Sequence, residues 1–170
     1  HEAHPSEIDE IALENIYIQE QFLNEHTDFI ASLRPINDCL IHGDLTHNNV
    51  FFHQDGRIKV TFDLDKTCVA PRSYELARSA IIICFDHAWD DTSFALADVF
   101  LRSYLAQCPM TFEEFREGMY MYIANFMHMT WLEKKIILHK SVRHEDLLHS
   151  SNIRVKHLAE EFLNLANRLY

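Results

Sequence analysis

Residues 41–65 read IHGDLTHNNVFFHQDGRIKVTFDLD and carry the clearest structural signal in the chain. Two short apolar and β-prone runs, residues 50–52 and 58–62, flank Asp55 and Gly56. An Asp-Gly pair favours a tight hairpin turn, because such a turn needs positive φ and glycine adopts it at little cost. The stretch therefore predicts a short strand end, a polar loop and a two-stranded ribbon.

Polar side chains stand on both sides of this predicted hairpin. Asp44 and Asn49 precede it, and Asp63 and Asp65 follow it. Because a hairpin brings its two ends together, we expect these loops to share one small volume. Carboxylate and amide oxygens are the ligands of hard divalent cations, so the arrangement suggests a divalent metal site.

The spacing of these residues resembles the catalytic loop of protein kinases. In that loop His-Arg-Asp-x-x-x-x-Asn is followed, after a β-hairpin, by a second Asp that binds metal. Residues 42–49, HGDLTHNN, keep the Asp-to-Asn interval, and Asp63 follows the hairpin. With Gly43 in place of the kinase Arg, the run resembles the aminoglycoside phosphotransferase and choline kinase-like family, which typically has HGDLHxxN and then IDFD. The resemblance continues through residues 71–77, PRSYELA, where that family tends to have a Pro and then DLA at the start of a helix.

The sequence departs from that family pattern at two positions. Thr46 replaces the usual His and Glu75 replaces the usual Asp, and neither change removes a group that does the chemistry. Asp65 would either contact a second metal ion or cap the following loop. The matched motifs cover about residues 40–80, and the helical remainder is compatible with the family without being diagnostic.

The resemblance implies a role for each matched residue. Asp44 would orient the hydroxyl of the acceptor and take its proton. Asn49 and Asp63 would hold Mg²⁺ against the phosphates of ATP, and His42 and Glu75 would support the loop. Phosphoryl transfer depends on positioning and on charge neutralisation, which oxygen-bound metal ions supply.

The family also implies an acceptor site against the helices that follow the metal-binding Asp. Candidate walls of that site are Phe85, Asp86, Trp89, Asp90 and Asp91. An aromatic ring beside carboxylates suits an ammonium group. Each residue also has an ordinary structural interpretation, because Asp90 and Asp91 are typical of helix starts and Trp89 could belong to the core.

Composition narrows the classes of partner. The chain has 170 residues with 26 acidic and 15 basic side chains, for a net charge of −11. This balance argues against nucleic acid or an anionic membrane as the main partner and fits a small cationic substrate, although many soluble proteins are simply acidic. The four cysteines form no Cys-x-x-Cys pair, and no signal peptide or bilayer-length apolar run is visible, so a reducing cytoplasm is expected.

Hydrophobic periodicity predicts helices along most of the chain. An amphipathic helix is expected over residues 6–33, and Ser73 would start another that runs to about Ala88. Asp90 or Asp91 would start a third. Thr111 and Glu114 form a capping box that opens a helix to about Ile137, and one last helix ends the chain. The remaining segments are predicted as a loop, residues 66–72, and as a loop with a short helix, residues 139–150.

The predicted fold class is therefore mainly α with a small β-hairpin, in one domain over residues 1–170. It resembles the larger, C-terminal lobe of a protein-kinase-like fold. With glycine only at positions 43, 56 and 118 and no Lys before Lys59, we expect the N-terminal lobe to be absent and the isolated chain to be inactive or nearly so. A surface left exposed between lobes would favour a homodimer.

The predicted function is ATP-dependent phosphoryl transfer to the hydroxyl of a small molecule such as an aminoglycoside, choline or homoserine. Two alternatives stay open. His42-x-Asp44-x-x-His47 has the residue types of a zinc or dinuclear metal site, as in a metal-dependent hydrolase. A kinase-like lobe could also serve as a non-catalytic interaction module.

Overall fold

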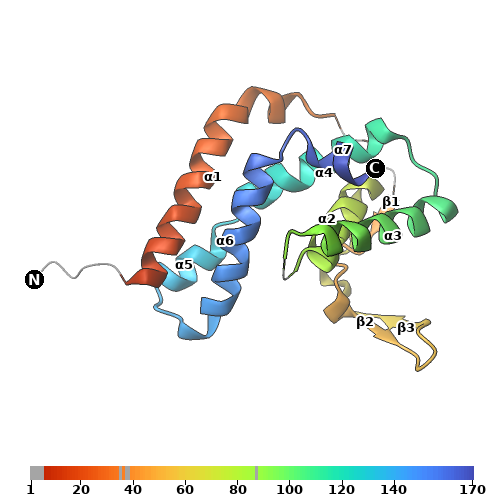
Figure 1. Cartoon of the computed structure of the whole chain (residues 1–170), viewed down its shortest axis with the longest axis horizontal. Helices are drawn as coiled ribbons and strands as arrows, with labels where there is room; N and C mark the ends of the chain where they lie inside the picture. Colours follow the sequence, from red (N-terminus) through yellow and green to blue (C-terminus); the bar gives the residue numbers. More distant parts are fainter. Residues whose placement is uncertain (1–5, 35, 37–38, 87) are drawn as a thin grey trace, which may run out of the picture. The chain divides into compact units, whose positions relative to one another are not determined.

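The computed structural model describes residues 6–34, 36, 39–86 and 88–170. The chain forms two compact units (Figure 1). Unit 1 consists of residues 1–32 and 123–165, and unit 2 of residues 33–122 and 166–170. Most of the described residues are helical. The strands in the described part of the chain are short and belong to unit 2. The predicted mainly α composition with a small β-hairpin is confirmed.

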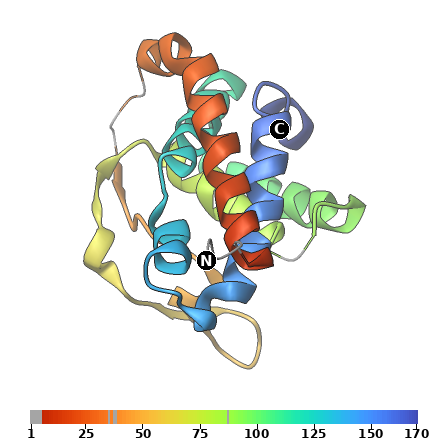
Figure 2. The ribbon, with the colours of Figure 1, turned by 90° about the vertical axis from the view of Figure 1, so that its left-hand side faces the viewer.

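Unit 1 is built on α1 (Glu7–Ser32), α5 (Trp131–Ile137) and α6 (Glu145–Glu160). Figure 2 shows α1 and α6 side by side. Their apolar faces meet in a buried cluster formed by Ala12, Leu132, Ile136 and Leu148. The amphipathic helix predicted over residues 6–33 is confirmed to within one residue at each end, and Ser6 caps it by accepting the Asp9 N–H at 3.2 Å.

The buried face of α1 also carries two amides that hydrophobic periodicity does not predict. Asn15 donates to Glu133 Oε1 at 3.0 Å and accepts a hydrogen bond from Asn152 at 2.8 Å. Gln19 donates to the carbonyl of Met129 at 3.1 Å. Buried amides are stable only when they are hydrogen-bonded, so these contacts fix α1 on its neighbours within unit 1.

The single helix predicted from Thr111 to Ile137 is wrong, because the structure has α4 (Phe112–Met127) and α5 separated by a turn. In that turn the His128 ring nitrogen Nδ1 lies 2.8 Å from the carbonyl of Ala124. The carbonyl of Met129 is the one that receives the Gln19 amide. The break is therefore stabilised by a side chain more than a hundred residues away, which local periodicity cannot reveal.

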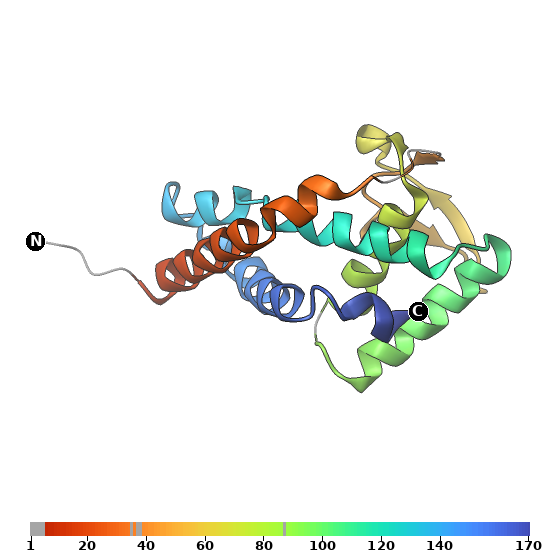
Figure 3. The same ribbon diagram turned by 90° about the horizontal axis from the view of Figure 1, so that it is seen from above.

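The predicted last helix is likewise two helices. α6 ends at Glu160, and α7 (Leu165–Leu169) follows after a turn. The region predicted as a loop and a short helix, residues 139–150, contains a 3₁₀ turn, Val142–His144, and the first part of α6. In unit 2, α7 lies against α3 (Asp91–Gln107), as Figure 3 shows, with the Arg168 guanidinium 4.0 Å from the centre of the Phe94 ring.

The β-hairpin in unit 2 consists of β2 (Val50–Phe52) and β3 (Ile58–Thr61). The strands are antiparallel, with Val50 opposite Thr61, and Gly56 in the turn has φ of 82°. The hairpin predicted from Asp55-Gly56 is confirmed. Figure 1 shows it projecting from the helices of unit 2.

A second two-stranded sheet joins β1 (Cys39–Ile41) to β4 (Cys68–Ala70). The prediction of a loop over residues 66–72 is wrong for the residues of β4. A strand of three residues is too short to show periodicity. It exists because Ile41 pairs with Cys68 from far along the chain, and this pairing closes the segment that carries the polar loops.

The helices of unit 2 begin at partly unexpected residues. α2 (Arg72–Cys84) has Pro71 at its N-cap, so the predicted cap at Ser73 is wrong, and the helix ends before the predicted Ala88. α3 is capped as predicted, because the Asp90 carboxylate accepts the Ser93 N–H at 3.0 Å. None of the helices in the described part of the chain is both long and apolar enough to cross a membrane.

The capping box predicted before α4 is half formed. Thr111 Oγ1 accepts the Glu114 N–H at 3.2 Å. The Glu114 carboxylate instead pairs with Arg72 at 2.7 Å, so it links the starts of α4 and α2 within unit 2.

Candidate active site

The loop after β1 is tied to the end of β3 through His42. The His42 ring nitrogen Nε2 lies 2.8 Å from the carbonyl of Phe62, and Nδ1 accepts the N–H of Asp44 at 3.3 Å. Both ring nitrogens are thus engaged with backbone. The imidazole fixes the position of Asp44 relative to the residue that immediately precedes Asp63.

Glu75 supports the same loop from α2. Its Oε2 accepts the N–H of Gly43 at 2.7 Å, while Oε1 is buried and has no hydrogen-bond partner among the described residues. Gly43 has φ of 79°, a left-handed backbone that favours glycine. His42 and Glu75 therefore hold the backbone on either side of this strained position.

Asn49 and Asp63 lie at the same end of the hairpin. Asn49 ends a 3₁₀ turn, His47–Asn49, and its carbonyl accepts the N–H of Phe62 at 3.1 Å. Its amide donates to the carbonyl of Asp44 at 2.8 Å. Asp63 has a left-handed backbone with φ of 61°, and Asp65 lies in the next turn, Leu64–Lys66. The structure thus brings Asp44, Asn49 and Asp63 to one end of the ribbon.

The donor chemistry of Asn49 and Asp63 fits a hard divalent cation. The Asn49 amide nitrogen is engaged with Asp44, which leaves its oxygen as a donor atom, and the Asp63 carboxylate is exposed and makes no ion pair with another described residue. Mg²⁺ is commonly held by one or two protein oxygens together with substrate phosphates. Within the described ranges no three His, Cys, Asp or Glu side chains gather closely enough to hold a metal ion by themselves.

Asp44 is paired with two cations that sequence reasoning missed. Lys66 donates to its Oδ2 at 2.8 Å, and Arg78, on α2, donates to its Oδ1. Partial burial raises the pKa of Asp44, but the hydrogen bond from Lys66 and the positive charge of Arg78 outweigh it, so the pKa lies below its usual range. Arg78 follows Glu75 by three residues and so shares its helix face, which is the one local signal that could have identified it.

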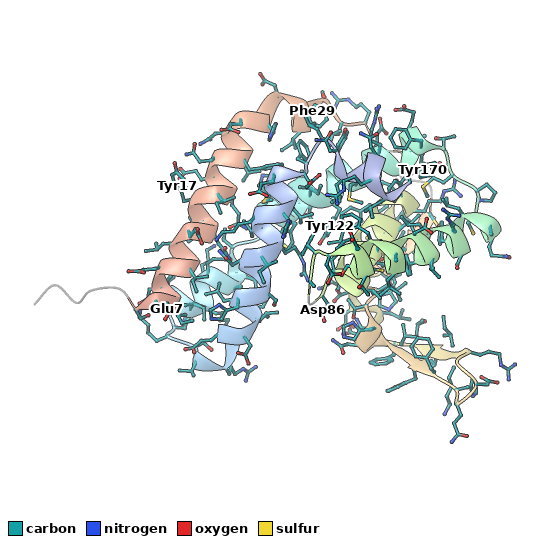
Figure 4. The ribbon with its side chains drawn as sticks, in the orientation of Figure 1. Glu7, Tyr17, Phe29, Asp86, Tyr122 and Tyr170 are labelled. Carbon is teal, nitrogen blue, oxygen red and sulfur yellow. The ribbon has the colours of Figure 1, made fainter. Side chains whose placement is uncertain are left out.

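The residues predicted to form the acceptor site divide into two groups. Phe85 is 1% exposed, and its ring lies 4.6 Å from that of Trp89 and 4.9 Å from that of Phe94, which makes it a core residue rather than a wall. Asp86, labelled in Figure 4, and Asp90 line a hollow of about 290 Å³ in unit 2. Asp90 also caps α3, and Asp91 lies in the first turn of that helix.

Comparison with known proteins identifies the family. Residues 7–117 match the model described as the phosphotransferase enzyme family, and this range includes every residue discussed above for Asp44 and its surroundings. No curated protein and no solved structure matches the chain. The match covers more than half of the chain and agrees with the resemblance carried by residues 42–49 and 71–77. The chain belongs to the phosphotransferase enzyme family, the family of aminoglycoside phosphotransferases and choline kinase-like enzymes.

Proposed function

We propose that this protein transfers the γ-phosphate of ATP to a hydroxyl group of a small cationic molecule, such as an aminoglycoside, choline or homoserine. The observation that carries the proposal is the meeting of Asp44, Asn49 and Asp63 at one end of the hairpin. The Phe62 N–H donates to the carbonyl of Asn49, and the Asn49 side-chain amide donates to the carbonyl of Asp44, so Asn49 is hydrogen-bonded both to Asp44 and to the residue before Asp63.

Each residue has one task in this proposal. Asp44 accepts a hydrogen bond from the acceptor hydroxyl and takes its proton, for which its ionised state at neutral pH is suitable. Asn49 and Asp63 hold Mg²⁺, which neutralises charge on the phosphates when it is bound. His42 and Glu75 keep the loop in place through their bonds to backbone. Asp65, exposed in the adjacent turn, is available to a second metal ion.

The contacts of His42 weigh against the alternative of a zinc hydrolase. A zinc-bound His needs one ring nitrogen for the metal. Here one nitrogen is at hydrogen-bond distance from the Phe62 carbonyl and the other accepts the Asp44 N–H. Asp44 in turn is paired with Lys66 and Arg78. A zinc site at these residues would require both sets of contacts to break.

The acidic hollow supports a cationic acceptor. Asp86 and Asp90 line it, and Trp89 lies between them in sequence. A carboxylate pair attracts an ammonium group through its charge, and the Trp89 ring would add a cation–π interaction to a ligand that extends to it. We propose Asp86, Trp89 and Asp90 as the acceptor-binding residues and leave Phe85 in the core.

The hairpin region supports a further proposal, association with a second copy of the chain. Apolar side chains on β2 and β3 are exposed, among them Phe51, Phe52, Ile58 and Val60. The register places Phe51 opposite Val60 and Phe52 opposite Ile58, and exposed apolar pairs of this kind favour association. Light scattering at working concentration should give at least a dimer mass, and a monomer mass would contradict the proposal.

The test of the proposed function is a coupled ATP-consumption assay with a panel of amino alcohols. The assay uses the native protein as purified from its source organism, rather than the isolated 170-residue chain. We expect Mg²⁺-dependent turnover with at least one acceptor, and loss of that turnover in D44N. K59M, which changes an exposed residue of β3, is the matched control and should keep full activity. Turnover that survives in D44N, or no phosphoryl transfer to any member of the panel, would overturn the proposal.

A further inference from the structure

Each carboxylate oxygen of Asp44 accepts a hydrogen bond from a cationic side chain. Lys66 donates to Oδ2 and Arg78 to Oδ1. A carboxylate that takes a proton from a hydroxyl must offer an oxygen to that hydroxyl. Each oxygen keeps a further lone pair for that hydroxyl, but the two cations lower the basicity of the carboxylate, so release of one of them would make Asp44 a stronger base for the proposed function.

The two cations are held very differently. The Arg78 side chain is 12% exposed and also donates to the carbonyl of Leu45 at 3.3 Å. The Lys66 side chain is 65% exposed, and its ammonium group makes no other hydrogen bond or ion pair with the described residues. Exposed ion pairs contribute little to stability, because water and salt compete for both charges. Lys66 is therefore the partner that can leave at small cost.

The backbone of Lys66 is nevertheless fixed beside the loop. The N–H of Thr67 donates to the carbonyl of Leu64 at 3.0 Å and closes the turn. The carbonyl of Lys66 packs so closely on Gly43 that a side chain at position 43 would collide with it. Lys66 thus has an anchored backbone, an exposed side chain whose ammonium group pairs with Asp44, and a position three residues after Asp63.

We propose that Lys66 is a phosphate-binding residue whose ion pair is exchangeable. Without nucleotide it neutralises Asp44, and with nucleotide its ammonium group pairs with phosphate oxygen and leaves Oδ2 of Asp44 to the acceptor hydroxyl. Arg78 stays in place as the permanent counter-ion that orients the carboxylate. This inference rests on the proposed function, and it assigns Lys66 and Arg78 to that reaction.

The test uses calorimetry with inorganic tripolyphosphate on the 170-residue chain, without metal or nucleotide. K66M should weaken binding about tenfold, since a charge-assisted hydrogen bond is lost. K66R should bind nearly as the parent does, and K59M controls for the loss of one exposed positive charge. D44N should tighten binding because it releases Lys66, and this gain should disappear in D44N/K66M. Circular dichroism of each variant verifies folding.

Three results would overturn the inference: no binding of tripolyphosphate to the parent chain, equal weakening by K66M and K59M, or a D44N gain that persists in D44N/K66M. The outcome can be told apart from that of the proposed function. If the mutant cycle holds while the native protein phosphorylates no amino alcohol, Lys66 binds phosphate and the proposed function fails. If turnover occurs while the cycle fails, the function stands without this role for Lys66.

Discussion

Gly43 packs on the carbonyl oxygen of Lys66, and a Cβ built at position 43 would lie 2.2 Å from that oxygen. The glycine also has φ of 79°. The N–H of Gly43 donates a hydrogen bond to the Glu75 carboxylate. Two segments of the candidate site, the loop after β1 and the turn after β3, can therefore touch only because position 43 has no side chain.

We expect G43A to lower the free energy of unfolding by about 2–4 kcal/mol, because it combines left-handed strain with a backbone collision. G56A is the matched control. Gly56 has φ of 82°, but no atom lies within 4 Å of the position that its Cβ would take. It should cost only about 1–2 kcal/mol of backbone strain. Urea unfolding of both variants measures the difference, and equal losses would contradict the packing argument.

For Gly118 in α4 we expect alanine substitution to change the stability in the direction opposite to the usual one. Alanine in place of a mid-helix glycine normally stabilises a helix by about 1 kcal/mol. Here a Cβ at position 118 would lie 2.4 Å from the backbone carbon of Ser73, so α4 and α2 would have to separate. We expect G118A to destabilise the protein by about 1–3 kcal/mol. Thermal unfolding of G118A measures this loss. S103A, at an exposed position of α3, is the control and should change the stability little in the same measurement. A more stable G118A protein would show that α2 and α4 are not in close contact at Ser73.

Glu75 should be needed for its acceptor oxygen more than for its charge. E75A leaves the N–H of Gly43 without its partner, which should cost about 1–3 kcal/mol of stability and lower phosphoryl transfer. E75Q keeps a carbonyl oxygen in the same place and should retain most of both. Unfolding in urea and turnover of the native protein measure the two effects. An E75Q protein as damaged as E75A would show that the charge itself is required.

Cys84 should make the protein less stable at alkaline pH. Burial raises the pKa of its thiol from 9.0 to about 11. The raised value means that the folded state favours the protonated thiol, so its contribution is fully present below pH 9.0 and is lost as pH rises through about 11. Unfolding free energies between pH 8 and 11 should fall less steeply in C84A, and an unchanged slope would contradict this assignment.

Thiol labelling gives an independent measurement of the same residue. Cys68 and Cys108 are exposed and Cys84 is buried. A thiol reagent should modify Cys68 and Cys108 in the folded protein and reach Cys84 only after unfolding, because the thiolate is the reactive form and burial disfavours it. Mass spectrometry of labelled peptides identifies the sites. Rapid modification of Cys84 in the folded chain would show that this part of α2 opens readily.

Local signals were sufficient for several parts of the molecule. Asp55-Gly56 predicted the hairpin, Asp90 predicted the start of α3, and the spacing from Asp44 to Asn49 and on to Asp63 predicted the family. Turn chemistry, helix capping and short motifs depend on residues that are neighbours in sequence. These features can therefore be predicted from the sequence without knowledge of the tertiary structure.

Other features depend on contacts between distant segments. The partners in the pairing of β1 with β4, in the contact of Gln19 with the break between α4 and α5, and in the two ion pairs of Asp44 are at least 22 residues apart in sequence. Neither Lys66 nor Arg78 belongs to a motif, and each reaches Asp44 because Gly43 and Glu75 bring the turn after β3 and helix α2 against the same loop. An ion pair depends on the distance between two side chains in space. The periodicity of residues along the chain does not reveal that distance when the two residues lie far apart in sequence.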